Sequence, residues 1–222
     1  MKEMKNLSNK AMICGFYGID SYDIIHYLSR IFKNLNKKVL LVDKSCNKAL
    51  FESISKPENL KGNSLVSYRD IDYMNEYEDN QASNYDYIFI DFGLNDKDKT
   101  IICDKLFLLT DLQVHNVNYI KRIYRVSNIK SKVIIIRNAI KCKIKPEFIL
   151  SQMGRTIHNS SYVIYEDFLD QESKIKCQYN DKIIFNRLSP MFKSSLKKIV
   201  IDEFKYNKKD IKKAYRLAAR GA

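Results

Sequence analysis

The sequence lacks the marks of several large protein classes. It has six glycines and three prolines among 222 residues, too few to form an obvious linker between domains. No apolar run approaches the roughly 18–20 residues that a membrane-spanning helix needs. Residues 1–6 carry an acid and polar side chains where a signal peptide would have an apolar run. We therefore expect a cytoplasmic protein.

Metal-binding and nucleophilic patterns are missing as well. The five cysteines are scattered, none forms a Cys-x-x-Cys pair, and no histidine lies near a cysteine at ligand spacing. The three histidines are isolated, and no Ser/His/Asp or Cys/His set is legible. These absences predict free thiols and no metal site, and they give no candidate catalytic residues.

Positive charge is in excess, with a formal net charge of +13. Residues 193–222 hold ten Lys and Arg against three Asp and Glu, whereas residues 70–111 hold three Lys against eleven acids. This asymmetry predicts a basic end and an acidic face. Two interpretations stay open. The excess follows from a composition crowded with Lys, Asn, Ile and Tyr, or it serves binding to an anionic partner.

Apolar runs alternate with helical periodicity along most of the chain. Continuous apolarity in the strands indicates burial on both faces, as in a parallel sheet. The pattern predicts an α/β fold with a doubly wound, mainly parallel sheet and helices on both faces. Strands are expected at residues 11–14, 38–43, 85–91, 105–110, 131–138 and 162–165. Helices are expected at residues 22–35, 114–126, 146–153 and 189–204.

Polar residues follow the carboxyl ends of these strands, where doubly wound sheets bind their ligands. They are residues 15–22, Asp43, Asp91, Arg137 and Asn138. In their order, these landmarks resemble the MinD/ParA family of deviant P-loop ATPases. The resemblance implies a P-loop NTPase-like fold in which Asp91 would bind Mg²⁺ and Asn138 would contact adenine.

The resemblance covers most of the chain, roughly residues 12–204. It implies that residues 85–91 correspond to the family's Walker B segment. It also implies that residues 162–199 form a short strand, an acid-containing loop and a final helix. Ser45 stands where the family usually has a water-orienting Asp.

The phosphate loop departs sharply from the family pattern, Gly-x-x-x-x-Gly-Lys-Ser/Thr, whose backbone N–H groups, lysine and hydroxyl hold phosphates and Mg²⁺. The corresponding residues here are Gly15, Phe16, Gly18, Asp20, Ser21 and Tyr22. Asp20 replaces the second Gly, Ser21 the Lys and Tyr22 the Ser/Thr. Phe16 replaces the lysine that the family extends across its dimer. An acid about 4 Å from a phosphate charge costs roughly 4 kcal/mol, so we expect no ATPase activity and no cofactor beyond weakly bound ATP and Mg²⁺.

Simpler interpretations of the same landmarks stay open. Asp43 and Asp91 could each cap the loop that follows them. Gly15 and Gly18 would then only permit a tight turn, and Asn138 would be an ordinary turn residue. In that case, none of these residues retains a role in nucleotide binding.

A basic segment closes the chain. Residues 1–204 are expected to form a single domain, and residues 205–222 a basic C-terminal helix or tail. One helical stripe of the segment is apolar, with Ile211, Ala214, Tyr215 and Ala218. The residues around it are Lys208, Lys209, Lys212, Lys213, Arg216 and Arg220. Such a helix could bind DNA phosphates, a partner protein or, less well given its thin apolar stripe, anionic lipid, or it could be a solvated charged helix.

Three functions fit these features. The leading hypothesis is a catalytically inactive MinD/ParA-like protein, similar to TadZ-like members with altered P-loops. It would act as a localisation or scaffold factor through a homodimer and through protein partners in a larger assembly. The alternative is a ParA-like DNA-binding regulator from a plasmid or mobile element, which would use the basic C-terminal region. The third is an enzyme of another kind that binds a different ligand in the same cleft.

Overall fold

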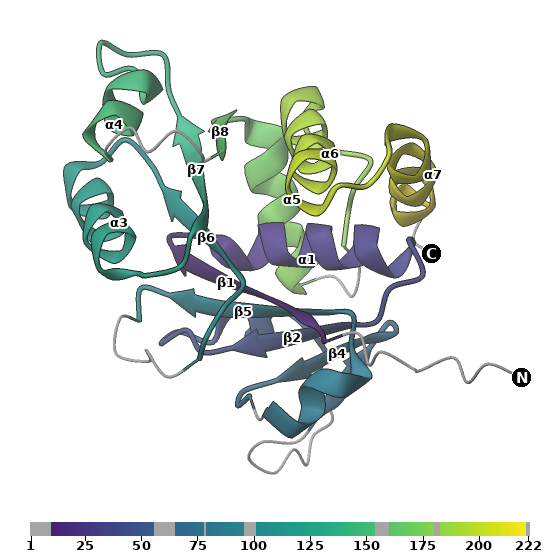
Figure 1. The fold of residues 1–222 in the computed structure, drawn as a ribbon. Coiled ribbons are helices and arrows are strands. Elements are labelled where there is room, and N and C mark those ends of the chain that lie inside the picture. The colour runs from purple at the N-terminus through teal and green to yellow at the C-terminus, as the bar shows by residue number, and fades with distance from the viewer. Residues whose placement is uncertain are drawn as a thin grey trace, which may run out of the picture.

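The chain folds around one eight-stranded sheet in the computed structural model, which describes residues 10–55, 65–77, 79–95, 101–153, 160–179 and 183–220 (Figure 1). The strand order is β3-β4-β2-β5-β1-β6-β7-β8. All neighbouring strands pair in parallel except β3 and β4, which pair antiparallel. The strands are β1 Met12–Gly18, β2 Val39–Asp43, β3 Val66–Tyr68, β4 Ile71–Met74, β5 Tyr87–Gly93, β6 Lys105–Thr110, β7 Ser131–Ala139 and β8 Ser160–Tyr165.

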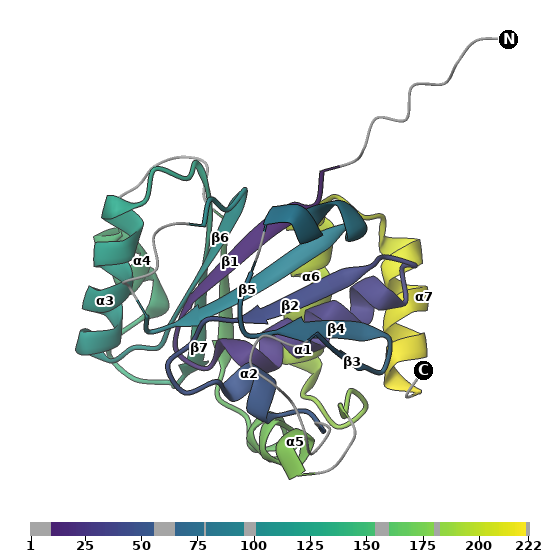
Figure 2. The same ribbon diagram turned by 90° about the horizontal axis from the view of Figure 1, so that it is seen from below.

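Helices cover both faces of this sheet (Figures 1 and 2). Helices α1, α2, α6 and α7 contribute to the apolar core on one face, and α3 and α4 to the core on the other. Helix α5 lies near the end of the sheet where α1 begins. The helices are α1 Ser21–Lys33, α2 Ala49–Glu52, α3 Val114–Val126, α4 Pro146–Gln152, α5 Phe168–Tyr179, α6 Pro190–Phe204, α7 Lys208–Ala219 and a 3-10 helix Asp79–Asn84.

The fold class predicted from the sequence is confirmed as an α/β fold with a mainly parallel sheet and helices on both faces. The central strands are buried on both sides, as their continuous apolarity indicated. All six residues of β6 are buried, including Lys105, whose ammonium lies 2.9 Å from the Glu203 carboxylate. This buried pair ties the centre of the sheet to α6.

Two parts of the fold differ from the sequence prediction. The acid-containing loop expected after residues 162–165 is helix α5. Its buried residues are Asp170 and Ser173, so the side that packs on the protein is polar and the helix has no buried apolar stripe. Strands β3 and β4 form an antiparallel pair between residues 43 and 85, where no strand was predicted from the sequence. They are three and four residues long, too short to show a clear alternation of apolar and polar residues.

The basic C-terminal segment is a helix that packs on the body of the protein. The apolar stripe of α7 is buried, in one core cluster with residues of α1 and α6. Asn207 caps this helix, because its side chain accepts a hydrogen bond from the Asp210 N–H at 2.9 Å. Within the described ranges, no helix combines the length and apolarity needed to cross a bilayer.

Candidate functional site

The connection between β1 and α1 is the first element of the site, and it is very short. The strand runs to Gly18 and the helix starts at Ser21, so only Ile19 and Asp20 join them. The prediction that the strand stops at Gly15 is therefore wrong. Gly15 pairs with β5 and β6 on its two sides, and Phe16 is fully buried. A phosphate cradle needs a loop of free backbone N–H groups, and this backbone is part of the sheet.

Phe16 fills core space where the family would place a cation. Its ring stacks on Phe107 with the centroids 4.7 Å apart and meets Phe89 edge-on at 5.7 Å. These contacts hold the side chain in the core on the α1 face of the sheet. Phe16 therefore cannot reach a ligand in the cleft.

Gly18 has a structural reason to be glycine. Its φ is +122°, a conformation that other residues rarely adopt. A Cβ atom at this position would lie 1.8 Å from the carbonyl oxygen of Leu109 on β6. The glycine therefore allows β1 to approach β6 closely. This packing explains the glycine without a bound phosphate.

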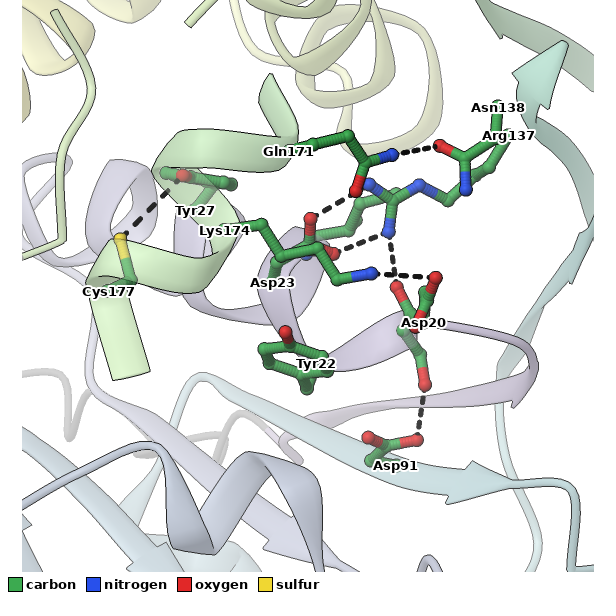
Figure 3. Close-up of polar contacts among 12 residues, drawn as sticks. Asp20, Tyr22, Asp23, Tyr27, Asp91, Arg137, Asn138, Gln171, Lys174 and Cys177 are labelled. Carbon is green, nitrogen blue, oxygen red and sulfur yellow. Dashed lines mark hydrogen bonds and ion pairs between the residues drawn. The ribbon is translucent and has the colours of Figure 1, made fainter. Parts of the chain in front are cut away.

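Arg137 and Asp23 form a buried ion pair beside this connection (Figure 3). The two guanidinium nitrogens donate to the two carboxylate oxygens at 2.5 and 2.8 Å, a bidentate arrangement. One of these nitrogens also donates to the backbone carbonyl of Asp20. Arg137 is 3% exposed and Asp23 4% exposed. The arginine that the sequence placed near a nucleotide is thus engaged by the chain itself.

Lys174, a second cation near α1, is also held in an ion pair. The Lys174 ammonium on α5 lies 2.7 Å from the Asp20 carboxylate and 5.6 Å above the Tyr22 ring (Figure 3). The positive end of a helix dipole lies at its N-terminus, where anions are favoured. Asp20 and Asp23 supply negative charge there, in the place where a P-loop protein holds its phosphates. The N-terminus of α1 is therefore neutralised without a ligand.

Helix α5 is fixed over the start of α1 by three polar side chains. Gln171 donates to the side-chain oxygen of Asn138 at 3.0 Å (Figure 3). Gln178 donates to the Tyr22 hydroxyl. Lys174 lies between them, so the three contacts come from one side of the helix. Asn138 has a φ of +50° at the end of β7. Its geometry fits a turn residue whose side-chain oxygen is already bonded.

Two buried carboxylates lie side by side at the ends of β2 and β5, because Asp43 and Asp91 are partners in register. The Asp43 carboxylate accepts hydrogen bonds from the backbone N–H groups of Ser45 at 3.0 Å and Phe51 at 2.8 Å. It also accepts one from the Ser45 hydroxyl. Asp43 therefore caps the segment that leads into α2, as the simpler interpretation proposed.

Asp91 accepts two hydrogen bonds at a single oxygen. The Ser21 hydroxyl donates to Oδ1 at 2.6 Å and the Gly93 N–H at 2.9 Å. In the P-loop pattern, Tyr22 stands at the Ser/Thr position whose hydroxyl holds Mg²⁺. In the structure, the hydroxyl that contacts Asp91 belongs to Ser21. Asp23, Gln171, Lys174 and Gln178 were also missed as site residues, because only the packing of α5 and β7 on α1 brings them together.

A cleft of about 320 Å³ opens between these strand ends and the start of α1. Its lining includes two acids, Asp20 and Asp91, and, among the described residues, no Lys, Arg or His. It also includes Ser21, Ser45 and Asn47. No group of three or more His, Cys, Asp or Glu in the described part of the chain is arranged to hold a metal ion. A triphosphate in this cleft would meet carboxylates and no basic side chain of the described lining.

The ionisation of Asp91 gives a pH-dependent prediction. Burial raises the pKa of its carboxyl to about 7, and the nearby carboxylates of Asp43 and Asp23 act in the same direction, against the Ser21 and Gly93 hydrogen bonds. The folded pKa exceeds the unfolded value of about 3.9, so the contribution of Asp91 to stability is full below about pH 4 and lost by about pH 7. Relative to wild type, Asp91→Asn should gain up to about 4 kcal/mol across this range. Urea unfolding at a series of pH values measures the difference, and a difference that does not change with pH would contradict the assignment.

The basic residues of α7 are outside this cleft and face solvent. Lys208, Lys209, Lys212, Lys213, Arg216 and Arg220 are all exposed. Lysines of α6 extend the same surface: burial lowers the pKa of Lys197, and the positive charges of Lys193 and Lys212 lower it further. The Lys197 ammonium lies 4.3 Å from the centre of the Tyr215 ring. The basic side chains therefore form one surface across two helices.

Comparison with protein-family models and with curated proteins finds no relative of the chain. The functional argument therefore depends on the geometry of the cleft and of the exposed helices.

Proposed function

We propose that the chain is a catalytically inactive protein of the MinD/ParA type that acts as a localisation or scaffold factor. The observation that supports this most directly is the two-residue connection between β1 and α1. It leaves no loop to wrap a triphosphate, and Arg137 and Lys174 are already paired with Asp23 and Asp20. Phosphoryl transfer depends on free cations and backbone donors at the phosphates. In this proposal the fold provides surfaces that bind other proteins, and it provides no catalytic site.

Helix α5 offers a surface of the kind that a scaffold needs. Phe168, Ile175 and Tyr179 lie on one side of the helix and are 79%, 55% and 85% exposed. Clusters of exposed apolar side chains mark protein contact sites in soluble proteins. Aromatic residues are also enriched at the centres of protein interfaces. This side of α5 supports contact with a second copy or with a protein of a larger assembly.

Self-association without nucleotide tests the proposal. We expect a concentration-dependent dimer by sedimentation velocity, because the α5 side chains would bury apolar area in the dimer. The double variant Phe168→Glu, Tyr179→Ser should weaken the dimer at least tenfold. Phe148→Glu serves as the matched control, since Phe148 is 54% exposed on α4, at the opposite face of the sheet. A monomer at all concentrations, or equal weakening by the control, would count against the proposal.

A second function, that of a DNA-binding regulator, is supported by α7. The helix buries its apolar stripe in the core and turns six basic side chains to solvent. An exposed basic helix is suited to phosphate contacts, whereas lipid binding would require its apolar stripe to leave the core. Retention on nonspecific DNA that falls steeply with salt would favour this function. A dimer that is not retained on DNA favours the scaffold.

A further inference from the structure

The polar groups that line the cleft present hydrogen-bond acceptors. The Ser21 hydroxyl donates its proton to Asp91, and the Ser45 hydroxyl donates its proton to Asp43. A hydroxyl has one proton and two lone pairs, so both oxygens keep acceptor capacity. The backbone N–H groups of Ser45 and Gly93 are also used, by Asp43 and Asp91. These donors at the strand ends are thus consumed within the protein.

Among the described residues, Asp91 has one carboxylate oxygen that accepts no hydrogen bond. Its side chain is 2% exposed and lines the cleft. Oδ1 accepts two hydrogen bonds, whereas Oδ2 accepts none from any residue in the described ranges. Arg137 and Lys174 are paired with Asp23 and Asp20 (Figure 3), and the Lys48 ammonium donates to the backbone carbonyl of Asp43. A buried carboxylate without a counter-ion is costly to ionise, and a cation that reached it would recover that cost.

The remaining lining suits a small organic ligand. Ile19, Tyr22, Ala49 and Leu94 supply apolar surface around the polar groups. The volume of about 320 Å³ is at the lower end of the range for small-molecule sites. The carboxylate of Asp20, with 38% of its side chain exposed, also borders the space.

We propose that this cleft binds a small organic cation, with a primary ammonium or guanidinium head that donates to Asp91 and an aliphatic stem against Ile19 and Leu94. The charge preference of the cleft is then opposite to that of a phosphate site. The ligand supplies N–H donors to the free lone pairs of Asp91, and its charge balances the carboxylate. The proposal does not depend on a scaffold function.

Anions, magnesium and neutral alcohols are less complementary to the cleft than an organic cation. An anion would face the carboxylates of Asp20 and Asp91 in a cleft whose described lining has no Lys, Arg or His. Magnesium keeps several waters in its octahedral shell and dehydrates reluctantly, and the Asp43 carboxylate beside Asp91 already accepts hydrogen bonds from Ser45 and Phe51. A neutral alcohol could accept or donate a hydrogen bond, but it would leave the charge of Asp91 unbalanced.

An amide-resolved NMR titration above the pKa of Asp91 tests the proposal. Butylammonium chloride and methylguanidinium chloride are the cationic probes, with butanol, butyrate and MgCl₂ as matched comparisons at constant chloride concentration. We expect saturable shifts of the Gly18, Ser21 and Gly93 amides with the cationic probes. Butanol and butyrate should produce no saturable change at these amides.

Variants identify the group responsible. Asp91→Asn preserves the shape and can still accept hydrogen bonds from Ser21 and Gly93, so it should remain folded and weaken butylammonium binding at least about tenfold. Glu147→Gln, which removes an exposed acid from α4, should leave the affinity unchanged. The proposal fails if the cationic probes cause no saturable shift, if butanol matches them, or if Asp91→Asn binds as well as wild type. Tighter binding of MgCl₂ at the same amides would also overturn it. Nucleotide binding and self-association are separate measurements, so their failure would be distinguishable from this one.

Discussion

Replacing Arg137 by methionine is expected to lower the free energy of unfolding by about 3–5 kcal/mol. The guanidinium makes a bidentate contact with Asp23, and both side chains are almost fully buried. Methionine would leave the Asp23 carboxylate buried without its counter-ion. It would also remove the donor to the Asp20 carbonyl that fixes the start of α1. Urea unfolding with a fitted slope measures the loss.

Two controls separate the ion pair from simple loss of packing. In the double variant Asp23→Leu, Arg137→Met no charge is left buried, so it should be less destabilised than Arg137→Met alone. Lys33→Met breaks an ion pair with Asp70, whose side chain is 81% exposed, and should change stability little. If Arg137→Met cost no more than Lys33→Met, the buried pair would have no such role.

Gly18→Ala is expected to destabilise the protein by about 4 kcal/mol or more. A Cβ atom there would lie 1.8 Å from the Leu109 carbonyl oxygen, and backbone atoms cannot move aside as a flexible side chain would. The φ of +122° adds backbone strain. The edge between β1 and β6 would have to separate, which should appear as a large fall in the midpoint of thermal unfolding.

Gly93→Ala is the matched control for this effect. Gly93 also has a positive φ, +52°, but its added Cβ would lie 3.0 Å from the Cβ of Ser45, with no backbone carbonyl in the way. We expect a loss of about 1–2 kcal/mol, the cost of a left-handed conformation. Equal losses for the two variants would show that the approach of β1 to β6 is not what requires Gly18.

Strong local patterns made much of the fold predictable. Helix α3 and strand β6 have the bounds expected from the sequence, because each has a legible apolar period or a continuous apolar run. Helix α5 was missed because polar contacts hold it in place: Asp170 accepts hydrogen bonds from the backbone N–H and the hydroxyl of Ser189 at the start of α6. Such contacts join residues far apart in the chain and leave no local signal.

The candidate site was predictable in location and less so in detail. Asp43 and Asp91 lie at the same edge of the sheet, as parallel strand ends must. The end of β1 was misplaced because glycine usually marks a loop, whereas Gly15 and Gly18 allow close packing inside the sheet. The partner of Asp91 is Ser21 because the connection is only two residues long.

Charge balance around α1 connects these observations to function. A phosphate-binding protein keeps cations available at the helix N-terminus until the ligand arrives. Here Arg137 and Lys174 are paired with Asp23 and Asp20 in the protein alone. These two cations therefore need no added anion to neutralise them. A nucleotide would have to displace these pairs and approach Asp91 as well.

Calorimetric titration of the protein with ATP in the presence of magnesium tests the central claim most directly. Because the cleft is lined by acids, by no Lys, Arg or His among the described residues, and by no phosphate-wrapping loop, we predict no saturable binding and a dissociation constant weaker than about 1 mM. ATP turnover should equal the background. Saturable micromolar binding of Mg-ATP, with a turnover that Asp91→Ala abolishes, would contradict the account.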